Sequence, residues 1–254
     1  MKPFSWRFIR MWQRNRDVFL RLWHSEAPGF VFEPIVILLA MGLGLGAYVG
    51  LVDGQKYIEF IAPGIIASYA MSSASFECTY GSFVRMEYQK TYDAILATPL
   101  NVEDIAAGEI FWGATRSFMT GTVILAIAAA FHLVPSPWAA VIPVLASLEG
   151  IMFASIALFV TSIVPSIYSF NYYFTLFITP MFFFSGVFFP LSSFPRIVQT
   201  LSWIAPLTPV VHLTRALISG ELHTDLLWSL ALIIVLTALF FSISLVTMRR
   251  RLTV

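Results

Sequence analysis

The sequence predicts an all-α integral membrane protein. Of its 254 residues, 58% are hydrophobic and 11% are charged, whereas a soluble chain is about half apolar and about a quarter charged. The apolar residues also form long uncharged runs, each long enough for a helix to cross a hydrocarbon core of about 30 Å. The charged residues gather mainly between and beyond these runs.

Six transmembrane helices are expected. Residues 150–195 contain no charged side chain. Because this run is too long for one span, Pro165 and Ser166 are expected to form a turn between the fourth and fifth spans. The six predicted spans are residues 30–51, 58–84, 109–131, 139–164, 172–190 and 226–248.

The chain is expected to form two units, residues 1–27 and the six-span domain 28–254. In the first unit, basic residues occupy one helix face and apolar residues largely another. This pattern predicts a basic interfacial helix on an anionic membrane surface, and a plain basic tail is the alternative. The basic residues are Lys2, Arg7, Arg10, Arg14, Arg16 and Arg21, and the apolar ones are Phe4, Phe8, Met11, Val18 and Leu22.

The distribution of basic residues predicts the orientation of the chain. Eleven lysines and arginines lie in the N-terminal segment, the loop 85–109 and the C-terminal end, against three on the other side of the predicted spans. Both termini and the loop are therefore expected in the cytoplasm, where basic residues accumulate. The segment 190–225 then lies outside; it is too apolar for a free loop and too rich in proline for a span, which predicts a re-entrant helical region.

The loop 85–109 is the only long polar stretch between apolar runs in the middle of the chain. Tyr92 and Leu96 belong to one face of a short helix, and Pro99 ends it because the residue before a proline avoids the α region. Residues 101–104, with Asn first and Asp last, have the spacing of a capping box for the next helix. A short amphipathic helix is predicted, and an ordinary solvated loop is the alternative.

Three charged residues, Glu77, Arg116 and Glu149, lie well away from the ends of the predicted spans. Glu77 and Arg116 lie at equal depth, roughly 12 Å from the cytoplasmic end at a rise of about 1.5 Å per residue. An ion pair between them would lower the cost of burying either charge. Glu149 lies near the middle of its span without an evident partner, and is either a polar point on a transport route or a hydrogen-bonded packing residue.

The fifth predicted span is rich in aromatic residues, including several in its middle where interfacial anchors are not needed. Flat apolar rings suit both the C–H face of a sugar and an acyl chain. The span is therefore a candidate substrate route, with helix packing or lipid contact as the alternative for any single ring. The candidate rings are those of Tyr172, Tyr173, Phe177, Phe182, Phe183 and Phe184.

The sequence contains no catalytic signature. It lacks a phosphate-binding loop (GxxxxGK followed by Ser or Thr) and the HExxH, GxSxG and CxxC motifs, so no catalytic residue, cofactor or metal site is expected. Its single cysteine, Cys78, excludes an internal disulfide and a multi-cysteine metal site. The formal net charge of +1 gives no indication of nucleic-acid binding.

The predicted layout and the central loop resemble the type-2 ABC exporter permeases. Lys90 stands where most members of that family have glycine, and the wider stretch 76–110 resembles the nodulation-factor (NodJ-type) branch, which exports lipo-chitooligosaccharides. The resemblance covers nearly the whole chain. The residues that match the family motif are Glu87, Thr91, Leu96, Thr98 and Pro99.

The resemblance implies a permease subunit in a bacterial inner membrane. It would work with two copies of a separate ABC ATPase, which uses ATP and magnesium, and with a second permease copy, often as a homodimer. The loop helix would be the coupling helix that docks into the ATPase. Its implied contact residues are Glu87, Thr91, Tyr92, Asp93, Leu96, Thr98, Pro99 and Leu100.

The implied cargo is an amphiphilic lipid that carries a glycan, and export of a small hydrophobic compound or drug is the runner-up. A channel or an intramembrane lipid enzyme without an ATPase is the alternative of another class. An enzyme would need clustered carboxylates or histidines at one depth, and a channel would need polar residues along one helix face. The sequence shows neither pattern.

Overall fold

Helices form the regular structure of residues 5–253, the part of the chain that the computed structural model describes, apart from an isolated bridge between Val52 and Gln55. The side chains of residues 26, 27, 30 and 31 also lie outside the description, as do residues 1–4 of the predicted interfacial helix. The predicted all-α class is confirmed.

The long helices are joined by short helical segments, several of them π-helical. The α-helices are α1 (Phe8–Leu39), α2 (Tyr57–Phe76), α3 (Thr91–Leu96), α4 (Val102–Ala130), α5 (Ile142–Ile163), α6 (Phe170–Tyr173), α7 (Thr179–Phe184), α8 (Arg196–Ser202), α9 (Leu207–Ser219) and α10 (Leu226–Leu252). The π-helical segments are Ala40–Gly44, Glu77–Gly81, Val84–Tyr88 and Phe174–Ile178, and the 3-10 segments are Leu45–Ala47, Pro137–Val141, Ile167–Ser169 and Leu191–Ser193.

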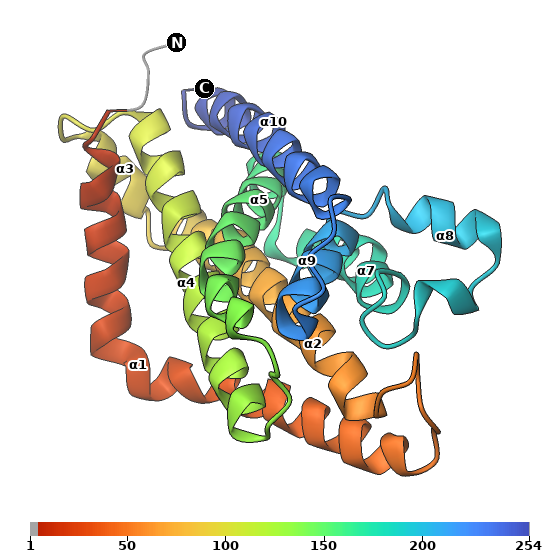
Figure 1. Cartoon of the computed structure of the whole chain (residues 1–254). Coiled ribbons are helices and arrows are strands. Elements are labelled where there is room, and N and C mark those ends of the chain that lie inside the picture. Colours follow the sequence, from red (N-terminus) through yellow and green to blue (C-terminus); the bar gives the residue numbers. More distant parts are fainter. Residues whose placement is uncertain (1–4, 254) are drawn as a thin grey trace.

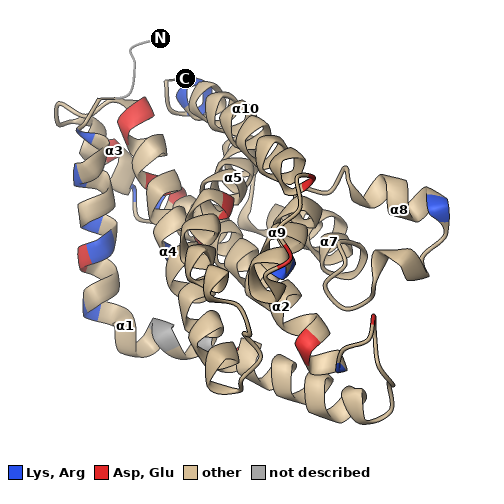
Figure 2. Cartoon of the chain, in the orientation of Figure 1, with Lys and Arg blue, Asp and Glu red and all other residues tan. Residues whose placement is uncertain are grey.

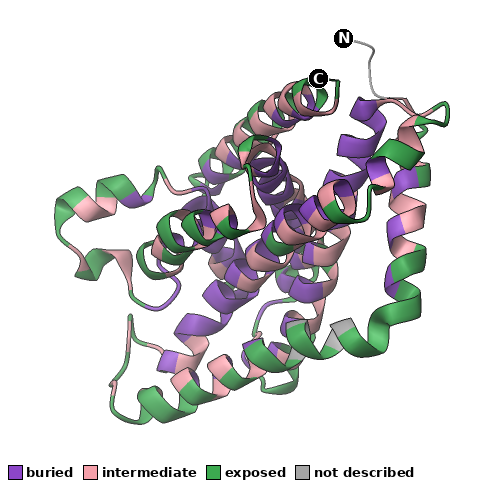
Figure 3. Cartoon of the chain, turned by 180° about the vertical axis from the view of Figure 1, so that it is seen from behind, coloured by how far each residue is buried: buried purple, intermediate pink, exposed green. Residues whose placement is uncertain are grey.

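Helices α2, α4 and α5 form the centre of the bundle (Figure 1). Helix α10 lies along α5, α1 packs on α4, and α9 packs between α2 and α10. Figure 3 shows the buried residues concentrated in the central helices, whereas much of α1 and α10 is exposed. The first turn of α1, the end of α10 and α3 lie at the same end of the molecule (Figure 1).

Within the described residues, three helices are long and apolar enough to cross a membrane: Val102–Ala130, Pro137–Ile163 and Leu226–Leu252. Helices α8 and α9 pass the same test only as a pair, and they are bent by 89° at the break between them. The short broken helices predicted for 190–225 are therefore present. The count of six spans is not confirmed, since the other predicted spans are shorter, bent or interrupted helices.

The boundary expected at residue 27 does not coincide with a helix end. Helix α1 continues through Pro28 and Pro34 to Leu39, and its path turns a corner between the two ends in Figure 1. Proline cannot donate a backbone hydrogen bond, and its ring crowds the carbonyl four residues earlier, so it bends a helix without always ending it.

The fifth predicted span ends earlier than expected. The turn at Pro165–Ser166 is confirmed, because α5 ends at Ile163 and Val164 is extended. The following helix runs through α6 and α7 and stops at Phe184, well before Pro190. Gly186 then adopts a left-handed conformation, with φ of +80°, which glycine allows without a steric penalty.

Close packing in the centre depends on glycines. A Cβ atom at Gly64 of α2 would lie 2.7 Å from Cα of Val187, and one at Gly150 of α5 would lie 2.7 Å from Cα of Ala114 in α4. Small residues let helix backbones approach in this way in lipid, where apolar burial alone does not drive association.

We expect Gly64→Ala to destabilise the protein by about 1–3 kcal/mol, because the backbone at Val187 cannot yield as a flexible side chain could. Thermal unfolding in detergent would measure the loss. Gly44→Ala is the matched control: its Cβ would meet nothing within 4 Å, and its φ of −67° is helical. Equal losses in both variants would contradict the packing argument.

Candidate functional site

Glu109, near the start of α4, is the centre of a buried hydrogen-bond network. Arg85 donates to both carboxylate oxygens, at 2.9 Å from Nε and 2.6 Å from Nη2. The Tyr92 hydroxyl donates at 2.9 Å, Ser82 Oγ at 3.2 Å and Asn15 Nδ2 at 3.3 Å. Since the carboxylate is fully buried, these donors replace its lost hydration. They join α1, α3, α4 and the segment before α3.

Arg85 also links this network to Glu77. Its Nη1 lies 2.9 Å from Glu77 Oε1, and a Cβ at Gly81 would lie 3.0 Å from the same oxygen. The absence of a side chain at Gly81 therefore leaves room for the ion pair to form across it. Both charged residues lie in π-helical turns, Glu77–Gly81 and Val84–Tyr88, which shift the helix face by about one residue relative to an α-helix.

The predicted pair of Glu77 and Arg116 is in contact but is not isolated. Arg116 Nε lies 3.6 Å from Glu77 Oε2, which is longer than the contact between Glu77 and Arg85. The sequence prediction missed Arg85 and Glu109 because both were assigned to the polar loop. The signal that could have found them is the helical spacing of Glu109 and Arg116, which are seven residues apart on one helix.

These ion pairs form one end of a cavity of about 680 Å³. The rest of its lining is amphiphilic, with aromatic rings, hydroxyl groups and a further carboxylate. The Tyr69 hydroxyl donates to Glu33 Oε1 at 3.2 Å, and the Tyr69 ring packs edge-on against Phe182 at 5.9 Å between centroids. The lining aromatic residues are Tyr69, Phe76, Phe174 and Phe182, the hydroxyl residues are Ser72, Ser73 and Thr120, and the charged residues are Glu33, Glu77, Arg85 and Arg116.

The six aromatic residues proposed as a substrate route do not act as one surface. Phe182 lines the cavity, whereas Tyr173 is buried with its hydroxyl 3.3 Å from Ser75 Oγ, and Phe177 stacks on Tyr173. The other three, Tyr172, Phe183 and Phe184, are exposed on the described chain. Helical periodicity alone could not distinguish the cavity-facing, buried and exposed faces of this helix, because aromatic residues occupy all three.

The segment 85–101, which contains α3, lies at the end of the bundle beside the first turn of α1 (Figures 1 and 2). The capping box of Asn101 and Asp104 is confirmed at the start of α4. Asp104 also accepts hydrogen bonds from the backbone and hydroxyl of Ser5, at 2.7 and 3.0 Å. Arg7 donates to the carbonyl of Pro99 at 2.6 Å, so the N-terminal end of the described chain holds this segment.

The assignment of Tyr92 as a contact residue for a partner is wrong. Its side chain is fully buried under α3 and holds this helix to Glu109. Burial, followed by the charge of Glu109, raises the pKa of Tyr92. Of the other residues assigned to this contact, the exposed ones are Asp93, Thr98 and Pro99, and the half-buried ones are Thr91, Leu96 and Leu100.

Glu87 is engaged within the chain as well. Its Oε1 accepts a hydrogen bond from Arg251 Nη2 at 2.8 Å, and this bond lowers the pKa of Glu87. Arg251 also donates to the carbonyls of Thr161 and Val164 at the end of α5. A basic side chain suits the last carbonyls of a helix. Arg251 therefore joins the end of α10 to α5 and to the segment 85–101.

Lys90 occupies a left-handed conformation, with φ of +50° and ψ of +29°, directly before α3. Glycine adopts this conformation without the steric cost that other residues bear. The structure therefore gives a physical reason for the glycine that most type-2 ABC exporter permeases have at this position.

Glu149 lies on α5 and is buried, with 1% of its surface exposed. Its Oε1 atom has no hydrogen-bond partner in the described part of the chain, and the residue is not part of the cavity lining. Its role on a transport route stays a prediction.

The apolar helices define the class of integral membrane proteins, and the bundle carries an amphiphilic cavity. Residues 7–219 match the family described as ABC-2 type transporter, and the chain belongs to that family.

Several relatives carry the name Nodulation protein J, and three of them follow. The chain is 39% identical to the protein of Sinorhizobium fredii, over 83% of this chain and 80% of that one. It is 37% identical to the protein of Rhizobium meliloti, over 85% and 83% of the two chains. It is 36% identical to that of Rhizobium leguminosarum bv. trifolii, over 98% and 95%.

We expect Glu109→Gln to destabilise the protein more than Glu77→Gln. The first change removes the carboxylate that all the buried donors share and leaves Arg85 with Glu77 alone, at a cost of about 3–5 kcal/mol. After the second change Arg85 keeps Glu109, so we expect a loss of about 1–2 kcal/mol. Denaturant unfolding in one detergent would compare them, and a larger loss for Glu77→Gln would contradict the assignment of Glu109 as the centre.

Proposed function

We propose that the chain is the permease subunit of an ATP-driven exporter for an amphiphilic lipid that carries a glycan. The observation that carries this proposal is the cavity of about 680 Å³, which has aromatic rings along one part and paired charges at one end. Rings such as Phe174 and Phe182 offer apolar contact to an acyl chain, and hydroxyl and charged groups offer hydrogen bonds to a polar head.

The relatives support the same class of cargo. The resemblance to the nodulation-factor branch implies a lipo-oligosaccharide, and the relatives named Nodulation protein J match most of the chain. A small hydrophobic drug is the runner-up, because four aromatic rings in one cavity also suit such a compound. The charged end of the cavity favours the amphiphile.

We propose that a separate ABC ATPase supplies the energy, with ATP and magnesium bound in that partner, and that two ATPase copies dock against two permease copies in a bacterial inner membrane. The supporting feature is α3, which presents Asp93 and, beyond its end, Thr98 and Pro99 to solvent. Basic residues along α1 and at the end of α10 (Figure 2) support a cytoplasmic position for this end and for both termini.

The network around Glu109 supplies a route from this docking surface to the cavity. A displacement of α3 acts on Tyr92, whose hydroxyl bonds to Glu109 at 2.9 Å. Glu109 holds Arg85 at 2.6 Å, and Arg85 holds Glu77 at 2.9 Å in the cavity wall. Each contact is short and largely buried, so movement of α3 has to rearrange or carry the charges that face the cavity.

Asp93→Arg is expected to weaken ATPase binding about tenfold, which corresponds to about 1.4 kcal/mol, because it reverses an exposed charge on α3 without removing a buried contact. Co-purification and ATPase stimulation in vesicles would measure the effect. Asp17→Arg, at an exposed aspartate of α1, is the control. If both variants bind the ATPase normally, α3 is not the docking element.

Phe182→Ala is expected to reduce export of a labelled lipo-oligosaccharide about tenfold, because it removes a ring from the cavity wall. Phe183→Ala removes the neighbouring ring, which is 48% exposed and is not part of that wall, so export should stay near normal. The comparison is made at equal expression in vesicles that contain the ATPase. Equal export in the two variants would remove this cavity from the route, and export of a drug but no glycolipid would favour the runner-up.

A further inference from the structure

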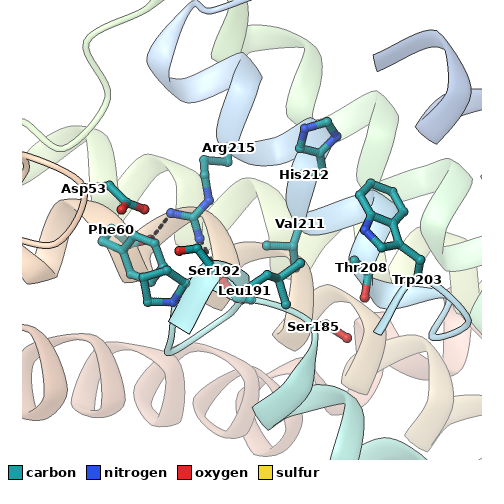
Figure 4. A pocket seen from close by; sticks show the side chains of 12 residues that line it. Asp53, Phe60, Ser185, Leu191, Ser192, Trp203, Thr208, Val211, His212 and Arg215 are labelled. Carbon is teal, nitrogen blue, oxygen red and sulfur yellow. Dashed lines mark hydrogen bonds between the residues drawn. The ribbon is translucent and has the colours of Figure 1, made fainter. Parts of the chain in front are cut away.

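A second cavity, of about 250 Å³, lies beside His212 and Arg215 of α9 (Figure 4). Helix α9 supplies one wall, with His212 and Arg215, and the chain after α7 supplies another, with Ser185 and Ser192. Asp53 and Phe60, from the chain that leads into α2 and from its start, and Trp203, which follows α8, also line the cavity. Four separate segments therefore converge on one small site.

Arg215 fixes the shape of this cavity. Its Nη1 donates to the carbonyl of Phe60 at 3.0 Å and its Nη2 to the carbonyl of Gly186 at 2.8 Å. The guanidinium also lies over the Phe60 ring, 3.9 Å from the centroid. A guanidinium carries five N–H groups, so these two bonds hold α2, α9 and the chain after α7 together and leave further donors for a ligand.

Ser185 gives an independent indication of a ligand. The residue is 1% exposed, and its hydroxyl has no hydrogen-bond partner in the described part of the chain. A buried polar group without a partner destabilises the folded protein, because it has lost its hydrogen bonds to water. Because Ser185 lines the cavity, a ligand with a hydroxyl or amide group would satisfy it.

An adjoining cavity of about 540 Å³ extends the site. It shares Asp53 and Arg215 with the first cavity and adds Gln55, Glu59 and Glu221. The two cavities together carry carboxylate and amide acceptors, guanidinium and hydroxyl donors, and the Trp203 ring. We call the two neighbouring cavities together the polar groove.

We propose that the polar groove binds a hydroxyl-rich oligosaccharide. Sugar hydroxyl groups both donate and accept hydrogen bonds, which suits alternating carboxylates, amides and Arg215, and a Trp203 ring face suits the apolar C–H face of a sugar. An anion is disfavoured because Asp53, Glu59 and Glu221 outnumber Arg215 in the groove. A metal is disfavoured because the described residues contain no cluster of three or more side chains suited to hold one.

This inference deepens the proposed function and rests on it: the groove would hold the glycan part of the cargo at the end of the molecule opposite the docking surface. The acyl part would find less apolar contact there, since the polar groove contains the rings of Phe60 and Trp203, whereas four aromatic residues line the cavity that contains Phe182. The polar groove would thus hold the glycan part of the cargo, and the cavity that contains Phe182 would hold the acyl part.

The test is calorimetric titration of the purified full-length chain in detergent with a linear N-acetylglucosamine tetramer, with inorganic phosphate as a comparison anion. We expect saturable binding of the tetramer and none of phosphate. Ser185→Ala should weaken binding about tenfold and should leave the unfolding temperature unchanged or higher, since it removes no hydrogen bond of the free protein. Ser193→Ala, at an exposed serine outside the groove, should bind normally.

A second pair of variants guards against indirect effects. Trp203→Phe keeps an aromatic ring but loses area, and should weaken binding a few-fold, whereas Trp138→Phe, at an exposed tryptophan outside the groove, should not. Equal affinity of Ser185→Ala and Ser193→Ala, binding of phosphate alone, or no binding of the tetramer would overturn the inference.

Failure here differs from failure of the proposed function. If glycolipid export proceeds while the tetramer does not bind, the polar groove is not a glycan site and the export proposal stands. If the tetramer binds at Ser185 but only a drug is exported, the export proposal fails while the site remains.

Discussion

The bundle depends on the burial of one carboxylate, that of Glu109. An unpaired buried charge would cost many kcal/mol, so the fold has to bring donors to it. Donors come from Arg85, Tyr92, Ser82 and Asn15, which lie on segments far apart in the sequence. The polar stretch before α4 is therefore folded back onto the helices, and the first part of α1 is held against α4 by the same requirement.

This requirement explains where sequence reasoning succeeded and where it failed. The apolar runs, the turn at Pro165 and the capping box at Asn101 follow from local chemistry, and each is present in the structure. The sequence could not place Arg85 and Glu109 in a buried network. A charged residue next to an apolar run is expected to face solvent unless its partner is known. The prediction for Tyr92 has the same limit. Periodicity identifies one face of α3, but it does not tell whether that face contacts a partner or the chain's own buried polar network.

The helix boundaries show a second kind of limit. The basic and apolar faces of residues 1–27 predicted a separate N-terminal helix, whereas α1 runs on through Pro28 and Pro34, because a proline removes one donor and bends a helix that packing still stabilises. Conversely, the run up to Pro190 contains no charged residue, but the helix stops at Phe184. The left-handed Gly186 and the bonds of Arg215 to nearby carbonyls decide this end, and neither is a periodic signal.

The two cavities lie on the same helix, which sets a constraint on any route between them. Phe60 lines the polar groove and Tyr69 lines the cavity with the ion pairs, and nine residues of α-helix separate them by about 13 Å. Between these positions lies Gly64, whose missing side chain lets the backbone at Val187 pack directly on α2. A cargo that moves along α2 from the charged cavity to the groove meets this backbone contact, which a side-chain rotation cannot open. The contact can part only if the chain from Ser185 to Phe189 moves away from α2, and Arg215 holds that chain through the carbonyl of Gly186.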